Sequence, residues 1–353
     1  MSVWQRLMHR PFFIRLFNWE YWSFHTVYIC IYPIWFFLCL RVRSLFFFSA
    51  SNPTIENGGF LMESKKKIYD ILPQEYYPRT ILIQPGESDA LILQKISEAG
   101  LTYPMIVKPD IGGKGRGVKK VSGVQELLDY IKRFPFDMLV QAFVPYPEEV
   151  GIFYYRYPDE GKGKISGIVG KHFLKVKGDG VSDIEQLLKK EPRYILQLPA
   201  LREMLGEGLR EVLPAGEERV LVPYGNHARG ALFVDYSEWA DEQLVNAMDA
   251  VCRQIPGFYY GRLDVRYTSL EKLREGKEFS IIELNGAGSE PTHMYDPKHS
   301  LFDAWGFFVK HWLILWRISR RNHAKGVPYM SFKEGVRMFK ETSKYDKVLD
   351  SLI

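Results

Sequence analysis

The chain has 353 residues, enough for two or three substructures with a substantial buried core. Its net charge of +5 is unevenly spread, because residues 1–50 hold five arginines against one acid and the remainder is almost neutral. This concentration of charge excludes a general nucleic-acid-binding surface.

An apolar, aromatic-rich segment opens the chain at residues 1–50. Its longest run without a fixed charge, Phe24–Leu40, would be about 25 Å long as a helix, against a hydrocarbon core of about 30 Å, and Pro33 interrupts it. Arginines flank the run on both sides, so a single span would leave basic residues outside the cytosol. We therefore expect a monotopic or re-entrant segment on the cytoplasmic side of the inner (cell) membrane. A single span and a soluble core element are the alternatives.

A short apolar run, Pro104–Pro109, contains Lys108 near its end. It is followed by the glycine-rich stretch Gly112-Gly113-Lys114-Gly115-Arg116-Gly117. Glycines adopt positive φ angles, which lets backbone N–H groups approach an anion such as phosphate. The stretch matches neither a P-loop nor a dinucleotide fingerprint, and an ordinary turn is the alternative.

Two later apolar segments end in acid and amide groups, at Asp264 in one and at Glu283 and Asn285 in the other. Alternate residues of a strand share a face, so Glu283 lies beside Asn285, and Asp264 can join them from a neighbouring strand. Arg262 shares the face of Asp264. Oxygen ligands of this kind suit Mg²⁺ bound together with nucleotide phosphates. A polar turn is the alternative.

Three further residues are candidates for contacts with substrate. His227 and Arg229 lie on a loop, Gly225–Gly230, that joins two predicted strands, and His293 follows the metal-binding segment. Such loops carry binding residues in many proteins, although a solvated turn explains the same pattern.

A second basic and aromatic segment, Trp305–Arg321, predicts an amphipathic helix. With residues 1–50 it contains seven of the eight tryptophans. Trp312 and Trp316 belong to its apolar side. Such a helix either lies in the headgroup plane of a membrane or closes the core of the protein. The three cysteines show no metal-ligand or disulfide spacing, which fits a reducing cytosolic setting.

The order of strand lysine, glycine loop and Asp…Glu-x-Asn set resembles the ATP-grasp superfamily, the enzymes related to D-alanine–D-alanine ligase and other carboxylate–amine ligases. The resemblance runs from about Thr80 to Asn322. It implies an α/β (α+β) fold in which two α+β subdomains sandwich ATP. We expect a membrane-associated segment at 1–50, a short preceding region at 51–100, an ATP-grasp catalytic domain at 101–325 and a C-terminal helical tail at 326–353.

The resemblance also implies roles for particular residues. The ATP-binding residues would be Lys65, Lys108, Gly112, Gly113, Lys114, Gly115, Arg116, Gly117, Gln141, Phe143, Val144 and Glu149, the last of these on the ribose. The ligands of Mg²⁺, or of Mn²⁺ in its place, would be Asp264, Glu283 and Asn285. The catalytic cations would be Arg262 and Lys171. Two features depart from the family: Gln141 stands where an acid often reads adenine, and the full α/β domain that usually precedes the strand lysine is missing.

The implied reaction is attack of a carboxylate on the γ-phosphate of ATP, followed by displacement of phosphate from the acyl phosphate by an amine. Positioning and charge stabilisation would carry the catalysis. Because basic and aromatic segments lie at both ends of the chain, we expect an amphiphilic or lipid-linked substrate and contact with a membrane surface. The protein could also form a homodimer, which the sequence does not decide. The alternatives are an ATP-grasp phosphotransferase and a non-catalytic ATP-binding membrane protein.

Overall fold

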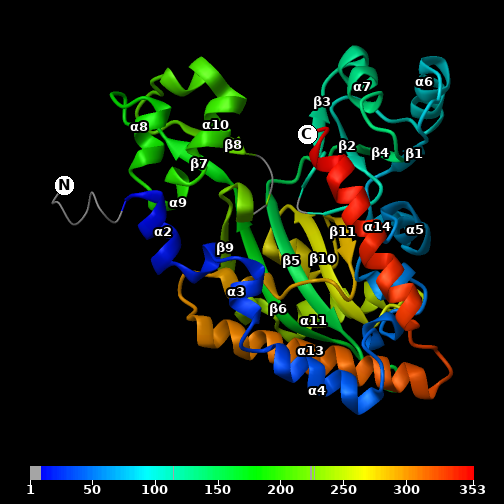
Figure 1. Cartoon of the computed structure of the whole chain (residues 1–353). Coiled ribbons are helices and arrows are strands. Elements are labelled where there is room, and N and C mark those ends of the chain that lie inside the picture. Colours follow the sequence, from blue (N-terminus) through cyan, green and yellow to red (C-terminus); the bar gives the residue numbers. More distant parts are fainter. Residues whose placement is uncertain (1–8, 114, 223–224, 226) are drawn as a thin grey trace. The chain divides into compact units, whose positions relative to one another are not determined.

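The computed structural model describes residues 9–113, 115–222, 225 and 227–353. Two compact units make up the chain (Figure 1). The small unit contains the residues up to Tyr32, Gly170–Val234 and Met294–Gly306. The large unit contains Pro33–Val169, Asp235–His293 and Phe307–Ile353. Each unit combines helices with strands, which confirms the predicted α/β fold class.

The first sheet of the large unit is antiparallel, in the order β1-β4-β2-β3. Its strands are β1 (Thr80–Ile83), β2 (Met105–Pro109), β3 (Lys119–Val121) and β4 (Met138–Ala142). The helices α6 (Asp89–Glu98) and α7 (Val124–Ile131) pack against it through buried apolar side chains. Met105 and Val107 of β2 point into this core, so the alternation of the strand places Lys108 on the opposite face.

The second sheet has the order β11-β10-β5-β6-β9. Its strands are β5 (Glu148–Tyr155), β6 (Lys164–His172), β9 (Leu232–Asp235), β10 (Tyr260–Tyr267) and β11 (Phe279–Asn285). The chain passes into the small unit within β6 and returns within β9. Leu263 and Val265 of β10 pack in a core with α5 (Lys65–Ile71), α11 (Glu242–Cys252) and α12 (Leu270–Arg274). Arg262 and Asp264 therefore lie on the other face of the sheet.

A third group of helices in the large unit includes most of α4 (Tyr32–Val42), the part of α13 (Leu301–Ala324) after Gly306, and α14 (Phe332–Asp350). The neighbouring segments α4 and α13 run side by side (Figure 1). The core that the group shares contains Leu38, Phe47, Phe48, Phe153, Tyr260, Ile314, Ile318 and Met338. Residues 33–50 thus belong to the large unit together with the residues that follow them, whereas the sequence predicted a boundary at residue 50. The physical reason is burial of Phe47 and Phe48, whose side chains are 0% and 2% exposed.

In the described part of the chain, the structure has no helix with the length and apolar content needed to cross a membrane. The apolar run Phe24–Leu40 is divided between α3 (Phe24–Tyr28) and α4.

The small unit has a two-stranded sheet, β7 (Leu174–Lys177) and β8 (Glu218–Val222). Its helices are α2 (Pro11–Phe17), α3, α8 (Ile184–Lys189), α9 (Pro192–Ile195) and α10 (Leu198–Leu205). Apolar residues of β7, β8, α8 and α10 form its core, with Leu188 and Leu213 fully buried. Asp183 starts α8 by accepting from the N–H of Gln186, whose side chain accepts from the N–H of Asp183 in return.

Asn52 is fully buried and ties two loops of the large unit together. Its Nδ2 donates to the carbonyls of Gly58 (2.9 Å) and Tyr260 (2.8 Å), and its Oδ1 accepts from the N–H groups of Tyr259 (2.9 Å) and Tyr260 (3.0 Å). We expect Asn52→Ala to lower the free energy of unfolding by about 3 kcal/mol or more, because buried backbone groups lose their partners. Urea denaturation measures this. Gln125→Ala, an exposed control on α7, should change it by less than about 0.5 kcal/mol. Equal values for the two variants would contradict the role of Asn52.

Candidate nucleotide and metal site

The polar face of β10 and β11 brings together the four residues predicted there. In the antiparallel register Asp264 lies opposite Glu283, and Arg262 lies opposite Asn285. Arg262 holds Asp264 through two contacts, Nε to Oδ1 (2.8 Å) and a second guanidinium nitrogen to Oδ2 (3.1 Å). The side chain of Asp264 is 5% exposed and that of Arg262 is 16% exposed. The predicted juxtaposition of two carboxylates, an amide and an arginine is therefore present.

A β-bulge on β11 aligns these side chains. The register passes from Asp264 opposite Glu283 to Val265 opposite Ile281, so Ile282 is the extra residue. The bulge allows Ile281 and Leu284 to enter the core while Glu283 and Asn285 remain on the polar face. It also frees the carbonyl of Ile282, which accepts hydrogen bonds from the side chains described next.

Lys108 ends in a buried polar cluster at this bulge. Its Nζ donates to Gln141 Oε1 (3.0 Å), to the Tyr69 hydroxyl (3.0 Å) and to the Ile282 carbonyl (3.1 Å). Burial lowers the pKa of Lys108 to about 8, although the carboxylates of Glu283 and Asp110 raise it. A buried cation next to the polar face is suited to hold phosphate oxygens. The structure thus places Lys108 at the bulge, on the residue that precedes Glu283, and its predicted role in binding ATP stays a prediction.

Lys65 links the same carboxylate to the glycine loop. Its Nζ lies 3.7 Å from Glu283 Oε1 and donates to the carbonyl of Gly112. Glu63, two residues earlier, has a buried Oε2 atom without a hydrogen-bond partner. Burial raises the pKa of Glu63, and the carboxylates of Glu283 and Glu56 add to this while Lys65 opposes it. The sequence pattern offered no signal for Glu63, because a single acid before a lysine is common on solvated helix starts.

The donor set fits a hard divalent cation. Asp264, Glu283 and Asn285 supply oxygen atoms, and the side-chain amide of Asn285 is orphaned, because its buried Nδ2 has no hydrogen-bond partner. An amide of this kind can present its oxygen to a cation by rotation about its last bond. Among the described residues no group of three or more His, Cys, Asp or Glu side chains is placed to hold a metal. Binding of a cation at this site would therefore need the side-chain amide of Asn285 as a third ligand. It would also need Asp264 to give up its contact with Arg262 and to contact the cation instead.

The glycine stretch has the backbone that the sequence predicted, since φ is +117° at Gly112, +65° at Gly115 and +67° at Gly117. Helix α14 packs against this stretch. Tyr345 donates to the carbonyl of Ile111 (3.0 Å), and Arg116 forms ion pairs with Asp350 (3.0 Å) and Asp346. The predicted phosphate contact of Arg116 would have to replace these pairs. Lys114 lies outside the described residues.

The side chains of the three predicted ATP-binding residues at the end of β4, Gln141, Phe143 and Val144, lie as follows. Gln141 is buried, with Oε1 bound to Lys108 and Nε2 donating to Thr80 Oγ1 (2.7 Å), so its side chain positions Lys108 and is not directed at adenine. Phe143 lies under Lys120, whose Nζ is 4.1 Å from the ring centroid. Val144 is half-buried.

The carboxylate expected to bind ribose, Glu149, has a partner within the second sheet. Glu149 is buried in β5, and its Oε2 lies 3.2 Å from Nε of Arg266, which is its partner in the register. Glu148, the preceding residue, is exposed at the start of β5. Because alternate residues of β5 share a face, Glu149 lies on the face of Gly151, which is opposite Asp264, and Glu148 lies on the core face of Val150 and Ile152. A contact of Glu149 with ribose would have to replace its pair with Arg266.

Lys171, His227 and Arg229 belong to the small unit. Lys171 is buried near the end of β6, and Arg229 is exposed. His227 does not have the open position predicted for a substrate contact, because its Nε2 lies 2.8 Å from Glu20 Oε2. Arg193 holds the same carboxylate at 3.0 and 2.8 Å, so Glu20 fixes the N-terminal residues onto the small unit. His227 and Arg193 lower the pKa of Glu20, and burial opposes them.

His293 is buried in the large unit and its ring packs on β6. A Cβ atom at Gly167 would lie 2.2 Å from that ring, so the strand accommodates the imidazole only because residue 167 is glycine. Phe307 contacts the other side of the ring, with 4.6 Å between the centroids. The packing of His293 is that of a core residue.

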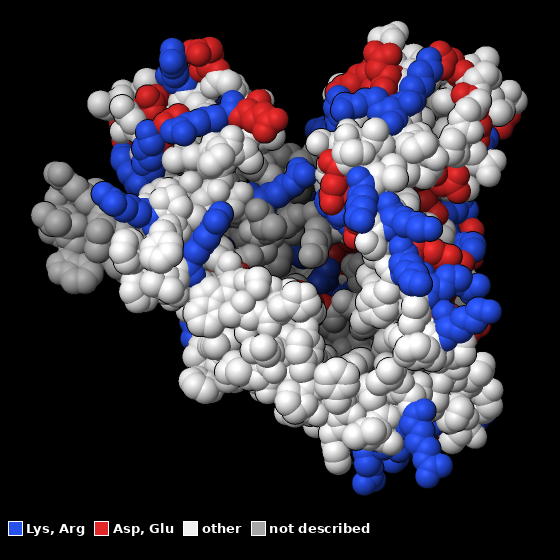
Figure 2. All heavy atoms as spheres, viewed as in Figure 1, with Lys and Arg blue, Asp and Glu red and all other residues white. Residues whose placement is uncertain are grey.

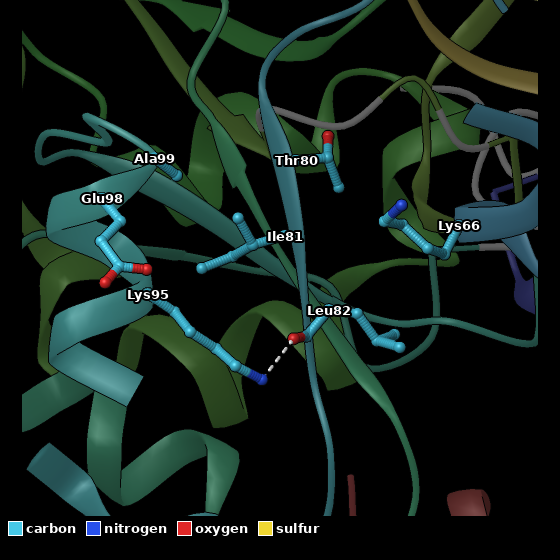
Figure 3. Close-up of a pocket in the computed structure, with 7 residues that line it drawn as sticks. All are labelled: Lys66, Thr80, Ile81, Leu82, Lys95, Glu98 and Ala99. Carbon is cyan, nitrogen blue, oxygen red and sulfur yellow. Dashed lines mark hydrogen bonds between the residues drawn. The ribbon is translucent and has the colours of Figure 1, made fainter. Parts of the chain in front are cut away.

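The hollow drawn in Figure 3 lies beside β1 and α6. It is lined by Lys66, Thr80, Ile81, Leu82, Lys95, Glu98 and Ala99. Lys95 Nζ donates to the carbonyl of Leu82 at 3.3 Å across one edge. None of the predicted site residues lines this hollow, although Thr80, which does, accepts a hydrogen bond from Gln141.

Comparison with solved structures finds ligases and a synthetase. A bifunctional glutathione synthetase from Pasteurella multocida aligns over 71% of this chain and 35% of its own length, at 14% identity and a TM-score of 0.39. The VanG D-Ala:D-Ser ligase from Enterococcus faecalis aligns over 70% of this chain and 61% of its own, at 14% identity and a TM-score of 0.38. The D-alanine–D-alanine ligase from Coxiella burnetii aligns over 78% of this chain and 61% of its own, at 10% identity and a TM-score of 0.39.

A D-alanine–D-alanine ligase, the enzyme to which the sequence motifs were compared, is thus among the solved structures that align with this chain. The chain spans less than two thirds of the length of each of these three proteins. No protein-family model matches the sequence, and no curated protein matches it either. The site residues themselves are therefore the basis of the function proposed next.

Proposed function

We propose that this protein is an ATP-dependent ligase that activates a carboxylate as an acyl phosphate and joins it to an amine. The observation that carries the proposal is the joint placement of a buried lysine, Lys108, and the polar face of Asp264, Glu283 and Asn285 at one bulge. The cation and the oxygen ligands required for MgATP lie next to each other in the large unit. No nucleophile–base pair is needed for this reaction, because the substrate carboxylate is the nucleophile.

The residues of the site would position the phosphates of ATP and stabilise their negative charge. Mg²⁺, when bound by Asp264, Glu283 and Asn285, would neutralise charge on the phosphates. Lys108 and Lys65 would bind phosphate oxygens, and Arg262 would turn from Asp264 to the transferring phosphoryl group. The carboxylate oxygen then forms a bond to the γ-phosphorus as ADP leaves. The amine attacks the acyl carbon, phosphate leaves, and the amine loses a proton. The glycine loop would exclude water and so protect the acyl phosphate.

We propose further that the substrate is amphiphilic or lipid-linked and that the enzyme acts at a membrane surface. The support is the exposed apolar surface of the chain, which includes Phe12 and Phe17 on α2 and Phe37 and Leu40 on α4, each more than half exposed. Large apolar side chains in such number are unusual on a protein that acts only on small polar metabolites.

The reaction class is tested with purified protein, MgATP and a membrane extract. Mass spectrometry of the products separates the candidates. A conjugate without added phosphate, formed with ADP and inorganic phosphate, supports the ligase. A phosphorylated product would instead establish a phosphotransferase, and absence of ADP release would establish ATP binding without catalysis.

The glycine loop provides a second test. Gly115 has φ +65°, a region that valine adopts only with strain. We expect Gly115→Val to lower ATP turnover about tenfold or more, because a misplaced loop misaligns the phosphates, and to lower the thermal midpoint no more than the control does. Gly86→Val is the matched control, since Gly86 has φ +82° in open space on a turn between β1 and α6. Equal turnover in the two variants would show that the glycine loop is an ordinary turn with no role in binding the phosphates.

A further inference from the structure

From Tyr32 to Leu40, helix α4 is apolar around its whole circumference, although the large unit covers only one side of it. Leu38 and Cys39 are buried, and Trp35 packs on Trp312 of α13 with 5.2 Å between the ring centroids. Trp316 of α13 donates from Nε1 to the carbonyl of Leu38 (3.2 Å). An all-round apolar helix is normally buried on every side, so the other side of α4 needs a different explanation.

The outer side of α4 presents three large apolar side chains. Phe36, Phe37 and Leu40 are 55%, 57% and 76% exposed. At 3.6 residues per turn these three share the side of the helix opposite Leu38. Single exposed apolar residues are common on soluble proteins, but a contiguous group on one helix face is typical of an interaction site.

Basic residues border this group, which we call the α4 face. Arg41 and Arg43 follow it along the chain, and Lys310 and Arg317 are exposed on the neighbouring α13. Neither α4 nor the part of α13 after Gly306 contains an acidic residue. Figure 2 shows this region at the bottom of the view as uncharged surface with Lys and Arg along its lower rim and no Asp or Glu.

We propose that the α4 face binds the surface of an anionic phospholipid bilayer. With 11 residues, α4 is about 16 Å long, which suits a helix lying in the headgroup plane with its apolar side in the acyl boundary. The arginines and lysine at the border would attract the lipid headgroups. A second copy of the chain fits less well, because a two-fold contact would bring two identical basic borders together. The inference rests on the membrane-surface part of the proposed function.

The surface differs from the one that the sequence suggested. In one of the two interpretations of the Trp305–Arg321 helix, Trp312 and Trp316 meet the headgroups, but their contacts with Trp35 and Leu38 are inside the large unit. The apolar side of α13 closes the core, and the outer side of α4 takes its place as the apolar surface.

The test is flotation of the full-length protein with vesicles. Vesicles of phosphatidylglycerol and phosphatidylcholine should carry the protein, whereas phosphatidylcholine alone or high salt should weaken binding. Phe37→Glu combined with Leu40→Glu should reduce binding at least tenfold. Leu91→Glu combined with Val124→Glu is the control, because these apolar residues of α6 and α7 are 40% and 44% exposed and the change in charge is the same. The control should bind as the wild type does.

Two results would overturn the proposal. One is unchanged vesicle binding by the Phe37→Glu, Leu40→Glu protein. The other is a wild-type dimer that ignores vesicles and becomes monomeric in this variant, which would make the α4 face a contact between copies. ATP turnover without vesicles, measured on the same proteins, keeps the two proposals apart. Vesicle binding without any turnover defeats the ligase and leaves the lipid-binding surface. Turnover without vesicle binding defeats the lipid-binding surface, together with the membrane-surface part of the proposed function, and leaves the ligase.

Discussion

Replacing Glu283 by glutamine, or Asp264 by asparagine, should lower Mg²⁺-dependent ATP turnover by a factor of about 10²–10³. Each change removes one negative charge from the polar face of β10 and β11 and keeps the shape of the side chain. Glu283→Gln is the cleaner variant, because its carboxylate is 28% exposed and its nearest cation, Lys65, is 3.7 Å away. Asp264→Asn also weakens a buried pair with Arg262, so its stability has to be measured alongside its activity.

A buried carboxylate elsewhere in the large unit supplies the control. Asp249 of α11 accepts from the Tyr154 hydroxyl (2.7 Å) and from the N–H of Gly163 (2.8 Å), on the side of the sheet away from Asp264. Asp249→Asn should lower the thermal midpoint and keep turnover per folded molecule. Wild-type turnover in both Glu283→Gln and Asp264→Asn, across a range of Mg²⁺ concentrations, would remove these residues from the metal site.

The polar face of β10 and β11 could be predicted because it depends on local periodicity alone. Residues two apart on a strand share a face, and apolar residues between them indicate which face is buried. The bulge at Ile282 could not be predicted in this way. It inserts one residue into the alternation, and the carbonyl that it frees becomes the partner of Lys108 and Tyr69. Only the pairing of two distant strands determines where such a bulge falls.

The choice between Glu148 and Glu149 shows the same limit. A one-residue shift along a strand exchanges its two faces, so two adjacent acids are equivalent in sequence until the register is known. The register of β5 with β10 places Glu149 opposite Arg266 in a buried ion pair and leaves Glu148 exposed at the strand start.

Long-range partners account for the remaining differences. The pattern of α13 correctly predicted an amphipathic helix, yet the residues that cover its apolar side come from α4, far earlier in the chain. From the local sequence, His227 is a candidate for substrate binding. Its actual partner, Glu20, lies 207 positions away in the chain and is not indicated by the local sequence. In both cases the local sequence specified a surface, and a segment distant in sequence determined what covers it.

Binding of ATP should weaken as the pH rises through about 8, because Lys108 then loses its charge. Burial lowers the pKa of Lys108 from its ordinary 10.5 to about 8, so the side chain is mostly an ammonium at pH 7 and mostly an amine at pH 9.5. Phosphate binding favours the ammonium, so the affinity should fall by up to about tenfold per pH unit above the pKa. Lys108→Arg keeps its charge throughout this range, and its ATP affinity should be independent of pH. Lys108→Met should bind about 100-fold more weakly at pH 7, also without pH dependence.

The lowered pKa of Lys108 also affects stability, but here the free energy of unfolding rises with pH, whereas the affinity for ATP falls. Without ATP, the cost of burying the ammonium is fully present below pH 8 and is relieved as the pH rises to 10.5, where the unfolded chain also loses the proton. The free energy of unfolding of the wild type should therefore rise by up to about 3 kcal/mol relative to Lys108→Met across this interval. Calorimetric titration with ATP and urea denaturation, both between pH 7 and 10, measure the two trends. ATP affinity that is flat with pH in the wild type, together with a flat stability difference from Lys108→Met, would show that Lys108 does not titrate in this interval.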